Sequence, residues 1–166
     1  MQKEGSPVFL RYHQGSVRGV SFSPRDRYLF CSGAYDGKVN LYTAQHMELL
    51  MCYQIASMGM TRNINAVRFT SDGSRILAAT TARRLAVIDV ERGEQVMTYD
   101  NCAYDTKDRA SLAADPICPN MAVCSSANGK VQMRSTSLSL QQRSIANHAA
   151  RRAKRPCCWI QFAIYS

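Results

Sequence analysis

The feature that most constrains this chain is a pattern that returns about every 46 residues. The stretch Val17–Thr43 contains three short strand-like runs separated by two turn signals. Moved along the chain by 46 or 47 residues, it meets a second copy. Val20–Phe22 aligns with Val67–Phe69, and Leu41–Thr43 aligns with Val87–Asp89. A repeat with this period predicts a stack of similar supersecondary units, each packed on its neighbours.

Each unit is predicted to contain four β-strands. Pro24 and Asp26 form the first turn signal, and Asp36-Gly37 forms the second, a dipeptide that favours tight hairpins. Strands spaced by about ten residues with turns between them are typical of all-β proteins. In the first unit we expect strands at Val17–Ser23, Tyr28–Gly33, Lys38–Thr43 and Glu48–Gln54.

A weaker third copy lies 92 residues after the first. Gly37–Val39 aligns with Gly129–Val131, and Cys31-Ser32 is set against Cys124-Ser125, which leaves the third copy one residue short before its turn. Residues 5–12 predict one more strand, placed like the outer strand of a preceding unit.

A four-stranded unit of about 45 residues resembles the WD40 repeat, the blade of a β-propeller. The residues that carry the resemblance are His13, Phe22–Pro24, Ser32-Gly33, Asp36-Gly37 and Leu41–Thr43, the last where the family usually has Leu-Trp-Asp. The resemblance implies an all-β fold. We expect an incomplete WD40-type propeller of two to three four-stranded blades, followed by an irregular basic C-terminal tail.

The resemblance also divides the chain. It implies an orphan outer strand of a missing blade at 1–12, WD40 repeats at 13–56 and 57–102, a degenerate repeat at 103–136 and a non-repeat tail at 137–166.

In WD40 proteins a hydrogen-bonded tetrad commonly ties a blade together. The resemblance places His13, Ser32, Asp36 and Tyr42 in the four positions, with Tyr42 where the family has Trp. A buried carboxylate needs partners, and an imidazole and a hydroxyl supply them. The second copy has Ile88, and the third Arg134, in the place of Tyr42, so we expect those two blades to rest on packing alone.

Composition narrows the class of protein. No apolar run is long enough to span a bilayer, and the N-terminus lacks a signal-peptide core, which favours a cytoplasmic or nuclear protein without a membrane partner. The seven cysteines are scattered apart from Cys157-Cys158, form no C-x-x-C pair and are expected to be reduced. The net charge is +9, concentrated in residues 137–166, and the body lacks a dense basic face, so nucleic acid is not the expected partner.

No enzyme, cofactor or metal site is predicted. His13, His46 and His148 are not spaced as metal ligands with one another or with cysteine, and no phosphate-binding glycine loop occurs. What remains is a protein-interaction scaffold whose partners are other proteins or peptides. Arg and Tyr are frequent interface anchors, so the candidate contact positions are Arg18, Tyr35, Arg62, Arg68, Arg83 and Arg84.

Three alternatives stay open. The chain could be a substrate-recruiting subunit of a ubiquitin ligase, although the Trp-Asp-x-Arg signature of such receptors is absent. It could associate with the nucleus or with nucleic acid through a basic cluster, Arg151, Arg152, Lys154 and Arg155. It could also be a truncated isoform without autonomous function. Open blade faces would further allow self-association.

Overall fold

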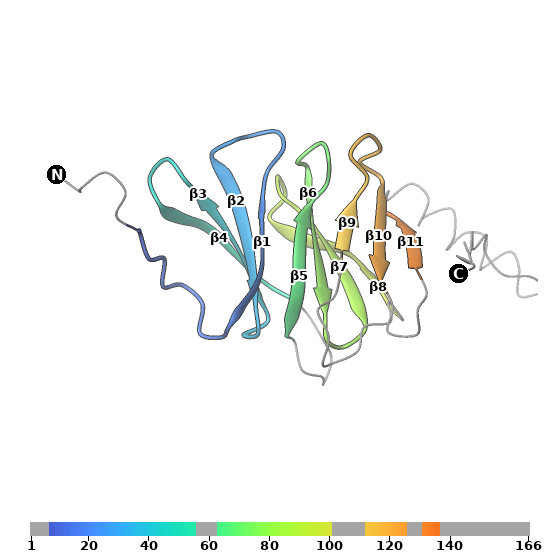
Figure 1. Cartoon of the computed structure of the whole chain (residues 1–166), viewed down its shortest axis with the longest axis horizontal. Helices are drawn as coiled ribbons and strands as arrows, with labels where there is room; N and C mark the ends of the chain where they lie inside the picture. The colour runs from blue at the N-terminus through green and yellow to red at the C-terminus, as the bar shows by residue number, and fades with distance from the viewer. Residues whose placement is uncertain (1–6, 56–62, 101–111, 126–130, 137–166) are drawn as a thin grey trace, which may run out of the picture.

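The computed structural model describes residues 7–55, 63–100, 112–125 and 131–136. Within those ranges the chain is all-β, as predicted, with eleven strands in three antiparallel sheets and no helix (Figure 1). The sheets stand side by side, and the described part of the chain does not close into a propeller. We call the sheets blade 1, blade 2 and blade 3 in chain order.

Strands follow one another in each blade as they do along the chain. Blade 1 contains β1 (Val17–Phe22), β2 (Leu29–Ala34), β3 (Lys38–Thr43) and β4 (Glu48–Gln54). Blade 2 contains β5 (Ile64–Phe69), β6 (Arg75–Thr80), β7 (Arg84–Asp89) and β8 (Glu94–Tyr99). Blade 3 contains β9 (Leu112–Ala114), β10 (Met121–Ser125) and β11 (Val131–Ser135). The four strands predicted for the first unit are confirmed to within one residue at each end.

Two hydrophobic cores hold the blades together, and blade 2 contributes to both. The first core lies between blades 1 and 2 and includes Cys31, Val39, Leu41, Ile64, Val67, Ile76, Ala78 and Ile88. The second lies between blades 2 and 3 and includes Leu77, Ala79, Leu85, Val87, Leu112, Ala122 and Cys124. Because side chains alternate along a strand, β6 and β7 each supply both cores, whereas β8 supplies the second core alone.

Close approach of blades 1 and 2 depends on two glycines. A Cβ atom at Gly33 would lie 2.5 Å from Val67 Cγ1, and one at Gly19 would lie 2.8 Å from the backbone nitrogen of Val67. A side chain at Gly19 would overlap the β5 backbone, and one at Gly33 would overlap the side chains of Val67 and Ile64. The close spacing of the two sheets at these points therefore depends on the absence of a side chain at Gly19 and Gly33.

Polar contacts also join neighbouring blades. The Phe69 amide donates to Ser21 Oγ at 3.2 Å, and the Arg68 guanidinium donates to the Val20 carbonyl at 3.0 Å. Between blades 2 and 3, Arg75 donates to the Thr136 carbonyl at 2.6 Å and the Tyr99 hydroxyl donates to the Ser135 carbonyl.

Two predictions from the sequence are wrong. A strand was predicted at residues 5–12, and the described part of it, residues 7–12, forms no strand, because no described strand lies beside it to complete a ladder of hydrogen bonds. The third copy was also predicted to be one residue short before its turn, but it has the full length there. Cys124 pairs with Gln132 as Ser32 pairs with Asn40, so a constant offset of 92 relates the two blades. A slip of one residue would turn Cys124 away from the second core, in which it is buried.

Candidate functional site

A chain of hydrogen bonds links the four tetrad residues at one end of blade 1. His13 precedes β1, Ser32 lies in β2, Asp36 lies in the β2–β3 turn and Tyr42 lies in β3. His13 Nδ1 is 2.9 Å from Asp36 Oδ2, and His13 Nε2 is 2.7 Å from Ser32 Oγ. Ser32 Oγ is in turn 3.1 Å from Tyr42 Oη. The structure therefore brings together all four residues that the resemblance singled out.

Asp36 is the most heavily coordinated group of this network. Its carboxylate accepts hydrogen bonds from His13 and from the backbone amides of Gln14, at 2.9 Å, and Lys38, at 3.0 Å. Burial alone would raise the pKa of Asp36. The two amide donors and the His13 ring outweigh burial, and the pKa of Asp36 is lowered from its ordinary value of 3.8. The carboxylate thus ties the segment before β1 to the β2–β3 turn.

Asn40 is a fifth member of the network that the sequence reasoning missed. Its side chain is fully buried, and Nδ2 donates to Tyr42 Oη at 3.1 Å. Asn40 Oδ1 has no partner among the described residues. The position of Asn40 could have been predicted, because residues two apart in a strand point to the same face of the sheet, and Asn40 is two before Tyr42. When the hydrogen of the His13 ring is on Nδ1, each group of the network donates to the next. Asn40 donates to Tyr42, Tyr42 to Ser32, Ser32 to His13 Nε2, and His13 Nδ1 to Asp36.

Blade 2 replaces this polar network with apolar side chains. Ala78 and Ala86 pair across the sheet as Ser32 and Asn40 do in blade 1, and Ile88 takes the place of Tyr42. Ala78, Ala86 and Ile88 are all fully buried in the first core. Packing therefore replaces hydrogen bonding at these positions of blade 2.

Blade 3 differs from both of the other blades at this position. Arg134 stands where Tyr42 stands in blade 1. Its guanidinium lies 5.7 Å from the centre of the Tyr99 ring and donates to the Asp100 carbonyl at 3.4 Å. The prediction that blade 3 rests on packing alone is wrong, because Arg134 reaches back to the last strand of blade 2.

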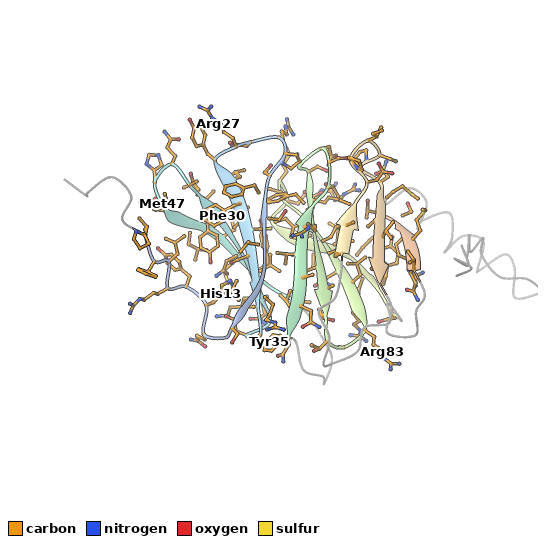
Figure 2. All side chains as sticks on the ribbon, in the orientation of Figure 1. His13, Arg27, Phe30, Tyr35, Met47 and Arg83 are labelled. Atoms are coloured by element: carbon orange, nitrogen blue, oxygen red, sulfur yellow. The ribbon has the colours of Figure 1, made fainter. Side chains whose placement is uncertain are left out.

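Four of the six candidate contact positions lie at one end of the sheets, which we call the Tyr35 edge: Arg18, Tyr35, Arg83 and Arg84. The Arg18 guanidinium lies over the Tyr35 ring, 5.0 Å from its centre. Figure 2 shows Tyr35 and Arg83 at this end and Arg27 at the opposite end. Arg83 is exposed in the β6–β7 turn, whereas Arg84 pairs with Asp100 at 2.7 Å.

Of the other two candidate positions, the structure describes Arg68. Arg68 projects from β5 and donates to the carbonyls of Val20 and Val67. Arg62 and the basic cluster Arg151, Arg152, Lys154 and Arg155 lie outside the described residues.

The described side chains form no group of three His, Cys, Asp or Glu residues that could hold a metal ion. Both ring nitrogens of His13 are engaged by Asp36 and Ser32. The network consequently positions backbone segments and presents no free base. No helix in the described ranges is long and apolar enough to cross a membrane.

One known protein family has a sequence model that matches the region of the chain that contains this network. The family model described as "WD domain, G-beta repeat" covers residues 6–43, which include His13, Ser32, Asp36 and Tyr42. The chain carries a WD40 repeat. The match ends where β3 ends, and blades 2 and 3 are WD40-like through their strand order and register. No curated protein matches the sequence.

Proposed function

We propose that this chain is a non-catalytic WD40 interaction module that binds a protein or peptide partner at the Tyr35 edge. The observation that carries the proposal is the exposed Arg18 guanidinium stacked over Tyr35. Arginine and aromatic side chains contribute a large share of binding energy at protein interfaces. A stacked pair offers both kinds of contact in one place.

The WD40 network supports the proposal because it holds this edge in place. The Tyr35 amide donates to the Ser16 carbonyl at 3.0 Å, and the next residue is Asp36, which binds His13 and Gln14. A Cβ atom at Gly15 would lie 2.6 Å from the Asp36 amide nitrogen, so the segment before β1 lies directly against the β2–β3 turn. A contact surface that is already ordered loses less entropy on binding.

The arginines of the edge favour a partner with carboxylates or exposed backbone carbonyls, which guanidinium groups bind well. A partner of this kind in the cytoplasm or nucleus is part of the proposal. Recruitment of substrates to a ubiquitin ligase would be one use of such a surface.

The test compares two stacked pairs at opposite ends of the sheets. The Arg18→Ala/Tyr35→Ala variant removes the pair on the Tyr35 edge. The Arg27→Ala/Tyr28→Ala variant is the matched control, because Arg27 lies 4.7 Å from the centre of the Tyr28 ring and both residues are exposed. Tagged full-length chains are used to capture partners from cell extract, and the captured proteins are compared by quantitative mass spectrometry.

We expect the first variant to lose specific partners that the wild type and the control retain. Retention of the same partners by both variants, with folding verified by circular dichroism, would place the binding surface elsewhere. Loss of the partners in the control alone would contradict the proposal directly.

A further inference from the structure

The free face of blade 1 carries a row of aromatic rings that no described blade covers. Ring centres are 5.5 Å apart for Phe22 and Phe30, 4.9 Å for Phe30 and Tyr42, and 6.0 Å for Tyr42 and Tyr12. Phe22 is 66% exposed. Its counterpart in blade 2, Phe69, is 5% exposed, since blade 1 covers it.

The free face of blade 3 shows the same contrast. Val131 is 48% and Met133 is 41% exposed. The residues at the corresponding places in blade 1 are Val39, at 0%, and Leu41, at 4%, both buried against blade 2. Phe22, Val131 and Met133 are thus exposed at the two ends of the stack, whereas their counterparts form a core inside it.

The internal contacts show how such faces pair. At the interface of blades 1 and 2, the face of blade 1 that includes Val39 and Leu41 packs on the face of blade 2 that includes Phe69. The free face of blade 3 corresponds to the Val39 and Leu41 face of blade 1, and the free face of blade 1 corresponds to the Phe69 face of blade 2. In one molecule these faces lie at opposite ends of the stack (Figure 1), so they can meet only between two molecules.

Blade 3 also has a free sheet edge. Its sheet runs in the order β11-β10-β9, and the described residues supply no fourth strand beside β11. The fourth strands of blades 1 and 2, β4 and β8, each directly precede the first strand of the next blade. Residues 7–12 hold the same place before β1. They have no sheet partner, and Val8 and Phe9 are exposed.

We propose that two copies of this chain associate head to tail, with blade 1 of each copy packed on blade 3 of the other. Residues 7–12 of one copy then add to β11 of the other as its fourth strand, a known mode of recognition for an exposed edge. The two contacts are related by a twofold axis. Two copies of three blades make six, within the roughly four to eight of closed propellers. This inference does not rest on the proposed function.

The test measures the mass of the full-length chain by light scattering as a function of concentration. Phe22→Asp places a charge on the free face of blade 1, and Met133→Asp places one on that of blade 3. Ile117→Asp is the control, because Ile117 is 90% exposed in the turn between β9 and β10. Circular dichroism verifies that each variant is folded.

We expect the wild type and the control to have twice the mass of one chain, and each face variant to have the mass of one. A mixture of the two face variants should regain association, because it restores one unaltered contact between blade 1 and blade 3. Amide hydrogen exchange of residues 7–12 should slow in the associated form.

Several outcomes would overturn the proposal. A wild type that keeps the mass of one chain at all concentrations would show that the two free faces do not bind each other. Dimers that survive Met133→Asp but not Phe22→Asp would show pairing of blade 1 with blade 1. A mixture that gains no mass over either variant, or masses beyond two chains, would contradict head-to-tail closure. Fast exchange of residues 7–12 in the dimer would contradict strand addition.

Discussion

Gly37 and Arg83 occupy the same place in their blades and share a left-handed backbone conformation. Each is the last residue of the turn between the second and third strands, with φ of 78° for Gly37 and 58° for Arg83. The β6–β7 turn of blade 2 therefore keeps the backbone path of the blade 1 turn without the glycine that favours it. Met47 and Gly93, which each directly precede the fourth strand of their blade, also share this conformation, with φ of 55° and 71°. Here the glycine is in blade 2.

Arg83→Gly is expected to stabilise the protein. A left-handed conformation costs a residue with a Cβ atom about 1–2 kcal/mol. Glycine is more flexible than arginine in the unfolded chain, and this offsets roughly 0.5–1 kcal/mol of the gain. The free energy of unfolding should rise by up to about 1 kcal/mol, measured as a higher urea midpoint with an unchanged slope. Gly37→Ala should lower the midpoint. A lower midpoint for Arg83→Gly would show that Arg83 contributes more through its side chain than its backbone costs.

Acid should weaken the protein through Asp36. Its pKa is lowered from 3.8, with burial opposed by hydrogen bonds from Gln14, His13 and Lys38. A carboxyl group that releases its proton more readily when folded contributes fully above pH 3.8, and this contribution is lost as the pH falls through the native pKa. Asp36→Asn should therefore lower stability at neutral pH and flatten its decline between about pH 5 and pH 2.

Ser32→Ala is the control for this experiment. It removes a hydrogen bond from the network without touching the carboxylate, so it should cost about 1–3 kcal/mol and leave the slope with pH unchanged. An Asp36→Asn variant with the wild-type slope would show that other carboxylates cause the acid sensitivity.

Gly33→Ala should loosen the contact between blades 1 and 2. The new methyl group would overlap Val67 Cγ1 and Ile64 Cγ2, so we expect a loss of about 1–3 kcal/mol. Val67→Ala removes one of the two overlapping groups. The double variant should consequently lose less than the sum of the two single losses in a double-mutant cycle. Additive losses would show that Gly33 is required for its backbone and not for the space it leaves.

Thiol reactivity should report the integrity of the cores. Burial raises the pKa of Cys31 to about 12, and Cys124 is likewise buried, whereas Cys52 is exposed on β4. Because the thiolate is the reactive form, iodoacetamide should label Cys52 in the folded protein and reach Cys31 and Cys124 only after unfolding. Peptide mapping by mass spectrometry distinguishes the sites. Rapid labelling of Cys31 under native conditions would contradict the packing of blade 1 on blade 2.

The repeat predicted much of the fold because strand spacing and turn residues are local properties. Asp36-Gly37 and the alternation of β3 were enough to place blade 1 and the tetrad. Residues 5–12 were predicted as a strand from their residue pattern and their position before the first unit, but a strand also needs a neighbour, which a local pattern does not contain. The offset of blade 3 was misjudged by one residue because Cys31-Ser32 and Cys124-Ser125 match in letters, whereas the hydrogen-bond register pairs Cys124 with Gln132.

The candidate site was predicted less completely than the fold. The resemblance identified His13, Ser32, Asp36 and Tyr42 because they belong to a known pattern, and it passed over Asn40, which does not. The stacking of Arg18 on Tyr35 depends on the turn of β2 into β3 and on a register shift in β1 between Val17 and Gly19. The turn was predicted from Asp36-Gly37, but the register shift, which no local residue pattern signalled, was not.

The chain order of the strands has a consequence for synthesis. Among the described strands, every sheet pairing joins a strand to the next one along the chain, so blade 1 can be complete while blade 2 is still inside the ribosome. The face that includes Cys31, Val39 and Leu41 is then bare until β5 emerges to cover it. During synthesis, a pause of the ribosome when Gln54 has just emerged and β5 has not would therefore leave this apolar face of blade 1 in water.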